Sequence, residues 1–114
     1  MCPRDGKIGC AYVDTLTNLD DVGRADALLS YSWGYLITEV SAALSAWTER
    51  AGRDPKRTHI WICSLCLNQH RIELGNAVAP EDLAKEFGER VVAIGHILPM
   101  LEPWDDPGYV KRAW

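Results

Sequence analysis

The sequence lacks the features that would place it in several specialised protein classes. Its 114 residues contain no run of about 20 apolar residues, the length that a membrane-spanning helix requires. Residues 1–6 contain no apolar stretch of the kind found in secretory signals. Lysine and arginine total 12 against 16 aspartates and glutamates, and they occur singly or in pairs. This excludes the basic stripe that tracks nucleic-acid phosphates. We therefore expect a cytoplasmic protein with neither a membrane nor a nucleic acid as partner.

Cysteines are also few, and their spacing does not match a common metal or redox motif. Without a secretory signal, all four are expected to remain reduced thiols. Cys63 and Cys66 form the one CxxC pair, but an apolar run surrounds them, which argues against a thioredoxin-type site at a helix start. A zinc site would have to combine Cys2, Cys10, Cys66 and His70 at irregular spacings. We interpret the cysteines as buried and inert, and we predict no metal and no resident cofactor.

What remains is the composition of one small globular domain. Hydrophobic residues make up 47% of the chain and charged residues 25%, which is enough apolar side chain for a core. A chain of this length forms a single domain, residues 1–114. Glycine and aspartate are frequent in residues 1–24, so we expect an irregular N-terminal arm there. A short edge strand at residues 10–13 is the alternative for the arm's apolar patch.

Three apolar runs are typical of strands. Residues 27–32 and 59–65 are continuous runs with little polar alternation, which predicts strands buried on both faces. Residues 96–101 form the third run. Pro99 lies within it and donates no backbone hydrogen bond, so this strand is expected to be short, bulged or at an edge of the sheet.

Two helices are predicted between these strands. Residues 36–50 carry apolar side chains at helical spacing along one face. Pro80, followed by two carboxylates, is typical of a helix start, and this second helix continues to Gly95. Residues 66–79 are predicted to be a loop. The alternation of strands and helices indicates an α/β fold with a small, open, mainly parallel sheet and flanking helices. Ligands bind such sheets at the carboxyl ends of the strands.

Two segments at that edge resemble motifs of a known family. Residues 27–34, ALLSYSWG, resemble the ALSYxWG motif of heterokaryon-incompatibility (HET) domains. Residues 60–69, IWICSLCLNQ, resemble the family's WIDxxCINQ motif, and the two occur in the family's order. The HET fold is similar to that of Toll/interleukin-1 receptor-like (TIR) domains. Residues 102–114 resemble the segment that leads into the fourth element of TIR-like domains.

The resemblance implies a TIR-like, flavodoxin-like fold and a protein-interaction role in signalling or defence. Such domains act through self-association, so the implied partner is a second copy of the chain or another TIR-like domain. Aromatic residues near the end of the sequence agree with this, because a small sheet leaves them partly exposed; they are Trp104, Tyr109 and Trp114. A complete sheet of this type has about five strands, so the predicted sheet is reduced or incomplete.

The alternative function is that of an NAD-processing hydrolase, an NAD nucleosidase with NAD as substrate or ligand. Catalytic TIR domains use a glutamate on a helix after the Trp-containing segment, and the sequence reaches only Trp114, before that residue. Cys63 also stands where the family has aspartate. Glu73 and Glu102 are the carboxylates that would take over the role of stabilising an oxocarbenium-like riboside. Each has the alternative of being a solvated surface residue.

The candidate ligand-binding residues lie in or near the two motifs: Ser32, Trp33, Gly34, Asn68, Gln69, His70 and Trp104. Trp33 either stacks on a planar ring or closes the end of the sheet. Ser32 and Gly34 either form the turn or hold a phosphate at the helix start. Asn68 and Gln69 either brace their loop or contact a ligand. His70 is either a general base or a surface residue.

Overall fold

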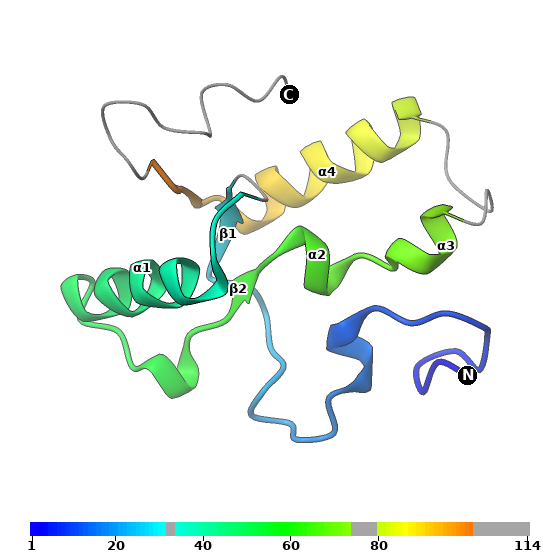
Figure 1. Ribbon diagram of the computed structural model, residues 1–114, viewed down its shortest axis with the longest axis horizontal. Coiled ribbons are helices and arrows are strands. Elements are labelled where there is room, and N and C mark those ends of the chain that lie inside the picture. The colour runs from blue at the N-terminus through cyan, green and yellow to red at the C-terminus, as the bar shows by residue number, and fades with distance from the viewer. Residues whose placement is uncertain (32–33, 74–79, 102–114) are drawn as a thin grey trace.

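A computed structural model describes residues 1–31, 34–73 and 80–101 of the protein. Within these residues three short strands form one parallel sheet (Figure 1). They are β1 (Ala27–Ser30), β2 (Ile60–Trp61) and β3 (Ile97–Pro99), and the order across the sheet is β2-β1-β3. The predicted α/β class and the small parallel sheet are therefore confirmed.

The central strand, β1, is the most deeply buried part of the molecule. All four of its residues are buried, and Leu28 is only 1% exposed. Leu28 is in register with Trp61 of β2 on one side and with Ile97 of β3 on the other. Both neighbours are edge strands of the described sheet. Pro99 of β3 pairs with Ser30, and an edge strand tolerates a proline because one of its sides needs no backbone N–H donor. The proline-containing strand, expected to be short, bulged or at an edge, has three residues and is terminal in the sheet that the described residues form.

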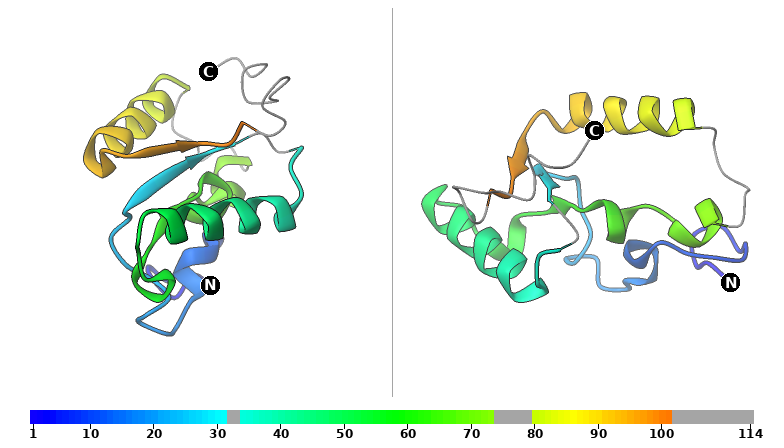
Figure 2. Two further views of the ribbon diagram at one scale, coloured as in Figure 1. Left: turned by 90° about the vertical axis from the view of Figure 1, so that its left-hand side faces the viewer. Right: turned by 45° about the horizontal axis from the view of Figure 1, so that its top comes forward.

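Two long helices, α1 (Ile37–Arg50) and α4 (Pro80–Ile94), lie on opposite sides of the sheet (Figure 2). This arrangement follows from the strand order. The connection from β1 to β2 and the connection from β2 to β3 run in opposite directions across the sheet, and crossovers of one hand then place their helices on opposite faces.

Each helix covers one face of the sheet with apolar side chains. On the α1 face, Val40 packs with Leu29 of β1 and with Met100, which follows β3. On the α4 face, Phe87 meets the edge of the Trp61 ring at a centroid separation of 6.0 Å. The buried apolar residues around the sheet are centred on β1; Val40 of α1, Trp61 of β2 and Met100 join it, and α4 contributes half-buried side chains such as Phe87.

The prediction of one strand over residues 59–65 is wrong beyond Trp61. After Ile62 the chain turns into a short helix, α2 (Cys63–Cys66), whose first turn is closed by bonds from the Leu65 and Cys66 amides to the Ile62 carbonyl. A short apolar run fits a buried helical turn as well as a strand, so its hydrophobicity alone cannot separate the two. The CxxC pair therefore does begin a helix, and both of its cysteines are half-buried.

The predicted loop over residues 66–79 also contains helix. A second short helix, α3 (Gln69–Glu73), begins three residues after α2 ends. The remainder of that predicted loop, residues 74–79, lies outside the described residues.

Residues 1–24 form an irregular N-terminal arm as predicted, apart from a one-turn 3-10 helix at Tyr12–Thr15 (η1), and β1 begins at Ala27. No strand forms at residues 10–13, so that alternative is wrong. A second 3-10 turn, η2 (Pro55–Arg57), precedes β2. The arm lies beside α2 and α3 (Figure 1). Among the helices of the described segments, none combines the length and the apolar character needed to cross a membrane.

Candidate functional site

The carboxyl ends of the strands open onto a cleft of about 370 Å³. Parallel sheets expose backbone groups and connecting loops at this edge, which is where α/β proteins bind ligands. The cleft is bounded by the connection that follows β1, the start of α1, and the helices α2 and α3. Its lining residues are Tyr31, Tyr35, Ile37, Val40, Ile62, Ser64, Leu65 and Gln69.

Two tyrosines line the cleft, and each hydroxyl group has a hydrogen bond, one to α2 and one to the residue after β3. The hydroxyl group of Tyr31, directly after β1, lies 2.8 Å from Ser64 Oγ in α2. The hydroxyl group of Tyr35 donates to the carbonyl oxygen of Met100, after β3, at 3.2 Å. Tyr31 therefore links the end of β1 to α2, and Tyr35 links the segment before α1 to the residue after β3. Both rings also pack against the buried cluster of Leu29, Val40 and Met100.

A carboxylate occupies the start of α1. The backbone N–H of Leu36 donates to Glu39 Oε2 at 2.7 Å, so one of the free amide groups of the first turn already has an acceptor. A phosphate bound at this helix start would meet the negative charge of Glu39. Gly34, one of the residues expected to hold a phosphate, lies in an exposed turn and is not among the described lining residues. This end of the cleft therefore favours an uncharged group over a phosphate.

The structure separates the three candidate residues Asn68, Gln69 and His70. Gln69 lines the cleft, and its Nε2 donates to the Cys63 carbonyl at 3.4 Å. Asn68 caps the first turn of α3, because its Oδ1 accepts the backbone N–H of Arg71 at 3.1 Å. His70 is exposed and stands against Gly9 of the N-terminal arm. Of the three, only Gln69 faces the cleft.

Arg71 joins this loop to the N-terminal arm. Its guanidinium group donates to both carboxylate oxygens of Asp5, at 2.8 and 3.0 Å. It also donates to the carbonyl oxygens of Ile8, at 3.1 Å, and Gly9, at 2.9 Å. The bidentate pair lowers the pKa of Asp5 well below its usual range and raises the pKa of Arg71. Sequence reasoning did not weigh Arg71, because no local pattern connects two residues that are 66 positions apart.

The candidate carboxylates are not placed by the structure. Glu73 is the last residue of α3, but its side chain is outside the described part of the chain. Glu102, Ser32, Trp33 and Trp104 also lie outside the described residues. The described lining of the cleft consists of aromatic, aliphatic, hydroxyl and amide side chains.

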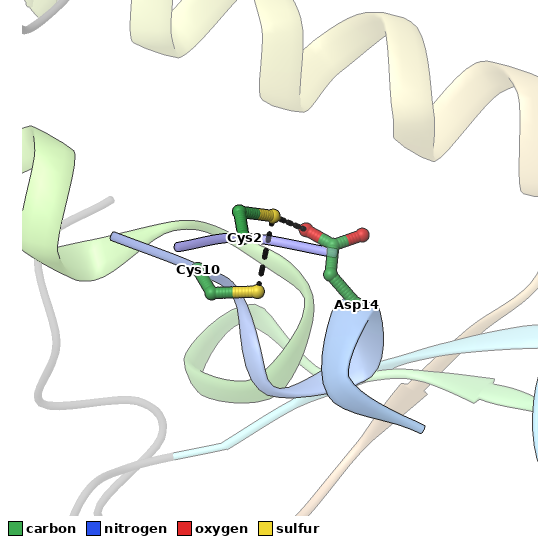
Figure 3. A group of neighbouring side chains, drawn as sticks. All are labelled: Cys2, Cys10 and Asp14. Carbon is green, nitrogen blue, oxygen red and sulfur yellow. Dashed lines mark hydrogen bonds between the residues drawn. The ribbon is translucent and has the colours of Figure 1, made fainter. Parts of the chain in front are cut away.

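The side chains that the structure describes include one group of three suited to metal binding, and it lies in the arm rather than in the cleft. Cys2 Sγ is 3.1 Å from Cys10 Sγ and 3.9 Å from a carboxylate oxygen of Asp14 (Figure 3). The neighbouring Cys2 thiol raises the pKa of Cys10 to about 11, and burial raises that of Cys66. Sequence reasoning grouped Cys2 and Cys10 with Cys66 and His70 and missed Asp14, four residues after Cys10. The short Cys-x-x-x-Asp spacing was the available signal.

Comparison with known proteins adds no relative: no family model matches the chain, and no curated protein or solved structure matches it significantly.

Proposed function

We propose that this chain is a TIR/HET-like, flavodoxin-like interaction domain whose carboxyl-edge cleft binds the aromatic ring of a nucleotide-type ligand. The observation that carries the proposal is the cleft itself, because Tyr31 and Tyr35 line it at the ends of the strands. Its volume of about 370 Å³ falls within the range of about 300 to 1,000 Å³ that is usual for small-molecule sites. Both motifs that resemble HET domains contribute to its lining, the first through Tyr31 and the second through Ile62, Ser64, Leu65 and Gln69.

The chemistry of the walls favours a planar, uncharged group. Aromatic side chains hold a base or a nicotinamide ring by stacking, and Gln69 and Ser64 offer amide and hydroxyl groups for its polar edge. Glu39 disfavours phosphate at the start of α1. NAD is the ligand that the resemblance suggests, with one of its rings in the cleft and its phosphates towards solvent.

Self-association is supported by apolar side chains at the rim of the cleft. Leu36 and Ile37, at the start of α1, are 66% and 78% exposed, and Leu65 of α2 is 38% exposed. Neighbouring exposed apolar side chains of this size are typical of interaction surfaces. The short strands β2 and β3 form the edges of the described sheet and leave backbone groups available to a second copy.

A binding experiment tests the ligand. We expect NAD, nicotinamide or adenosine, titrated into the protein in a calorimeter, to bind, and Tyr35→Ala to weaken binding about 5- to 100-fold through loss of stacking. Tyr35→Phe keeps the ring and should retain most of the affinity. Tyr12→Ala is the matched control, because Tyr12 is 57% exposed on η1 and does not line the cleft. No binding of any of the three ligands at millimolar concentration would refute the proposed ligand.

A second pair of measurements separates the interaction domain from the hydrolase. In light scattering, the mass of the wild type should rise with protein concentration, and Ile37→Lys should remain a monomer. Val92→Lys is the matched control and should behave like the wild type, because Val92 is 82% exposed on α4, away from the cleft. A monomer at every concentration contradicts self-association. If the wild type releases nicotinamide from NAD, and Glu73→Gln or Glu102→Gln abolishes this release, the chain is a hydrolase and not an interaction domain alone.

A further inference from the structure

We propose that Cys2, Cys10 and Asp14 bind a zinc-type divalent cation that fastens the N-terminal arm to itself (Figure 3). This site is separate from the cleft and does not depend on the function proposed for it. The three ligand atoms lie within 4.8 Å of one another. Thiolate and carboxylate are both ligands that zinc accepts.

The backbone of the arm is folded so that the two cysteines meet. The Cys2 amide donates to the Lys7 carbonyl at 2.7 Å, and the Gly6 amide donates to the Cys2 carbonyl at 2.8 Å, which closes a tight loop. Gly9, with φ of +82°, then turns the chain back so that Cys10 lies beside Cys2. Local backbone bonds therefore close the loop, and Arg71 of α3 holds the same segment through its hydrogen bonds to Asp5, Ile8 and Gly9.

The 3-10 helix η1 brings the third ligand. It begins two residues after Cys10, and its first turn carries Asp14, whose amide donates to the Ala11 carbonyl at 3.1 Å. Ala11 is 3% exposed and the side chain of Asp14 is 9% exposed, so the carboxylate is held at the inner side of the arm. Figure 3 shows the carboxylate directed at the Cys2 sulfur.

The distances are near those of a tetrahedral site. Zinc–sulfur bonds of about 2.3 Å and a zinc–oxygen bond of about 2.0 Å separate two sulfurs by about 3.8 Å and a sulfur and an oxygen by about 3.5 Å. The two sulfurs are 3.1 Å apart and Cys2 Sγ is 3.9 Å from Asp14 Oδ2. On binding, the sulfurs would separate by roughly 0.7 Å and the carboxylate would approach by roughly 0.4 Å. Three protein ligands leave the fourth position for water.

A divalent cation also suits the charge that these groups carry when they coordinate. Two thiolates and a carboxylate then carry three negative charges, and a divalent ion cancels two of them. The cationic partner that the structure gives Asp14 is Arg4, at 3.3 Å, and the Arg4 side chain is 60% exposed. Cys2 is only 2% exposed, so its thiolate would form there only together with the bound ion.

A disulfide between Cys2 and Cys10 is the competing use of the same thiols. It would form by loss of two protons and two electrons to an oxidant, and it would leave the Asp14 carboxylate beside a neutral bond. A metal would use Asp14 together with both thiols, whereas a disulfide would leave Asp14 with Arg4 as its charged partner, and for this reason we favour the metal.

Cobalt titration tests the proposal on the full chain, after treatment with a reductant and a chelator. We expect one equivalent of Co²⁺ to give the thiolate charge-transfer band and the visible bands of tetrahedral cobalt, and Zn²⁺ to displace it. Cys10→Ser should abolish the charge-transfer band expected from two thiolates, and Asp14→Asn should weaken binding by at least about tenfold. Cys63→Ser is the matched control, because Cys63 lies outside the cluster and should bind like the wild type.

Amide exchange provides a readout that does not depend on the cobalt spectrum. Added zinc should slow exchange at the Cys2 and Gly6 amides in the wild type and in Cys63→Ser, and not in Asp14→Asn. Three results would overturn the metal site: no charge-transfer band, equal affinity in Asp14→Asn and Cys63→Ser, or a Cys2–Cys10 disulfide whose reduced form takes up no metal.

Discussion

Replacing Gly9 with alanine should detach the N-terminal arm from the loop that contains His70. Gly9 has a φ of +82°, and a Cβ atom built on it would lie 2.5 Å from Cδ2 of the His70 ring. Real Cβ atoms do not approach another heavy atom this closely, so either the ring or the arm must move. Gly6 provides a matched control, because its φ is +69° and a Cβ atom there would meet nothing within 4 Å.

Both alanine variants strain the backbone equally, and they differ in what the new Cβ atom would contact. An L-residue in left-handed backbone costs about 1–2 kcal/mol, and this applies to Gly6→Ala and Gly9→Ala alike. Only Gly9→Ala adds the cost of displacing the exposed His70 ring, about 0.5–1.5 kcal/mol. We therefore expect Gly9→Ala to destabilise the arm by about 1.5–3.5 kcal/mol, against about 1–2 kcal/mol for Gly6→Ala.

Native-state amide exchange is the appropriate assay, because the arm can open without unfolding of the sheet. The reporting amides are those of Cys2 and Gly6, whose hydrogen bonds close the loop at the start of the arm. In a His70→Ala background the excess cost of Gly9→Ala should disappear, leaving the backbone cost alone. Equal effects of the two glycine variants, or an excess that persists without the His70 ring, would show that the ring does not pack on the arm.

Two further predictions concern the body of the domain. Leu28→Ala should lower the free energy of unfolding by about 2–5 kcal/mol in urea denaturation, whereas Val92→Ala, at a side chain that is 82% exposed, should change it by less than about 0.5 kcal/mol; a small loss at Leu28 would contradict its burial in β1. The Asp26 carboxyl group accepts the His59 amide at 2.9 Å and pairs with Arg53 at 3.2 Å, and these contacts lower its pKa from the usual 3.8. These contacts therefore add about 1 kcal/mol to the free energy of unfolding above pH 3.8, and this stabilisation is lost as the pH falls through the lowered pKa of Asp26. The urea midpoint of the wild type should accordingly be higher than that of Asp26→Asn at pH 7, and the two midpoints should converge in acid. A difference that does not change with pH would show that the ionised Asp26 carboxylate is not the cause of the stabilisation.

The elements predicted correctly from the sequence are those with a clear hydrophobic periodicity or with residues that mark a helix boundary. The helix at residues 36–50 has an apolar stripe, and Pro80 with its two carboxylates marks the start of α4 within one residue of the structure. The run at 59–65 has neither feature beyond its hydrophobicity. Its change from strand to helix at Ile62 depends on packing around the sheet edge and on the contact of α2 with η1, both of which are set by residues distant in sequence.

The candidate site shows the same limit at the level of single residues. Asn68, Gln69 and His70 are consecutive, and the prediction that they lie in a loop places all three around one ligand. Once the segment is the first turn of α3, positions three apart share a face and the residue between them points elsewhere. Asn68 therefore caps the amide of Arg71 beside the arm, while Gln69 lines the cleft. One helical turn thus divides adjacent residues between the cleft and the arm, and it does so through hydrogen bonds from Arg71 to residues more than 60 positions away, which no local pattern encodes.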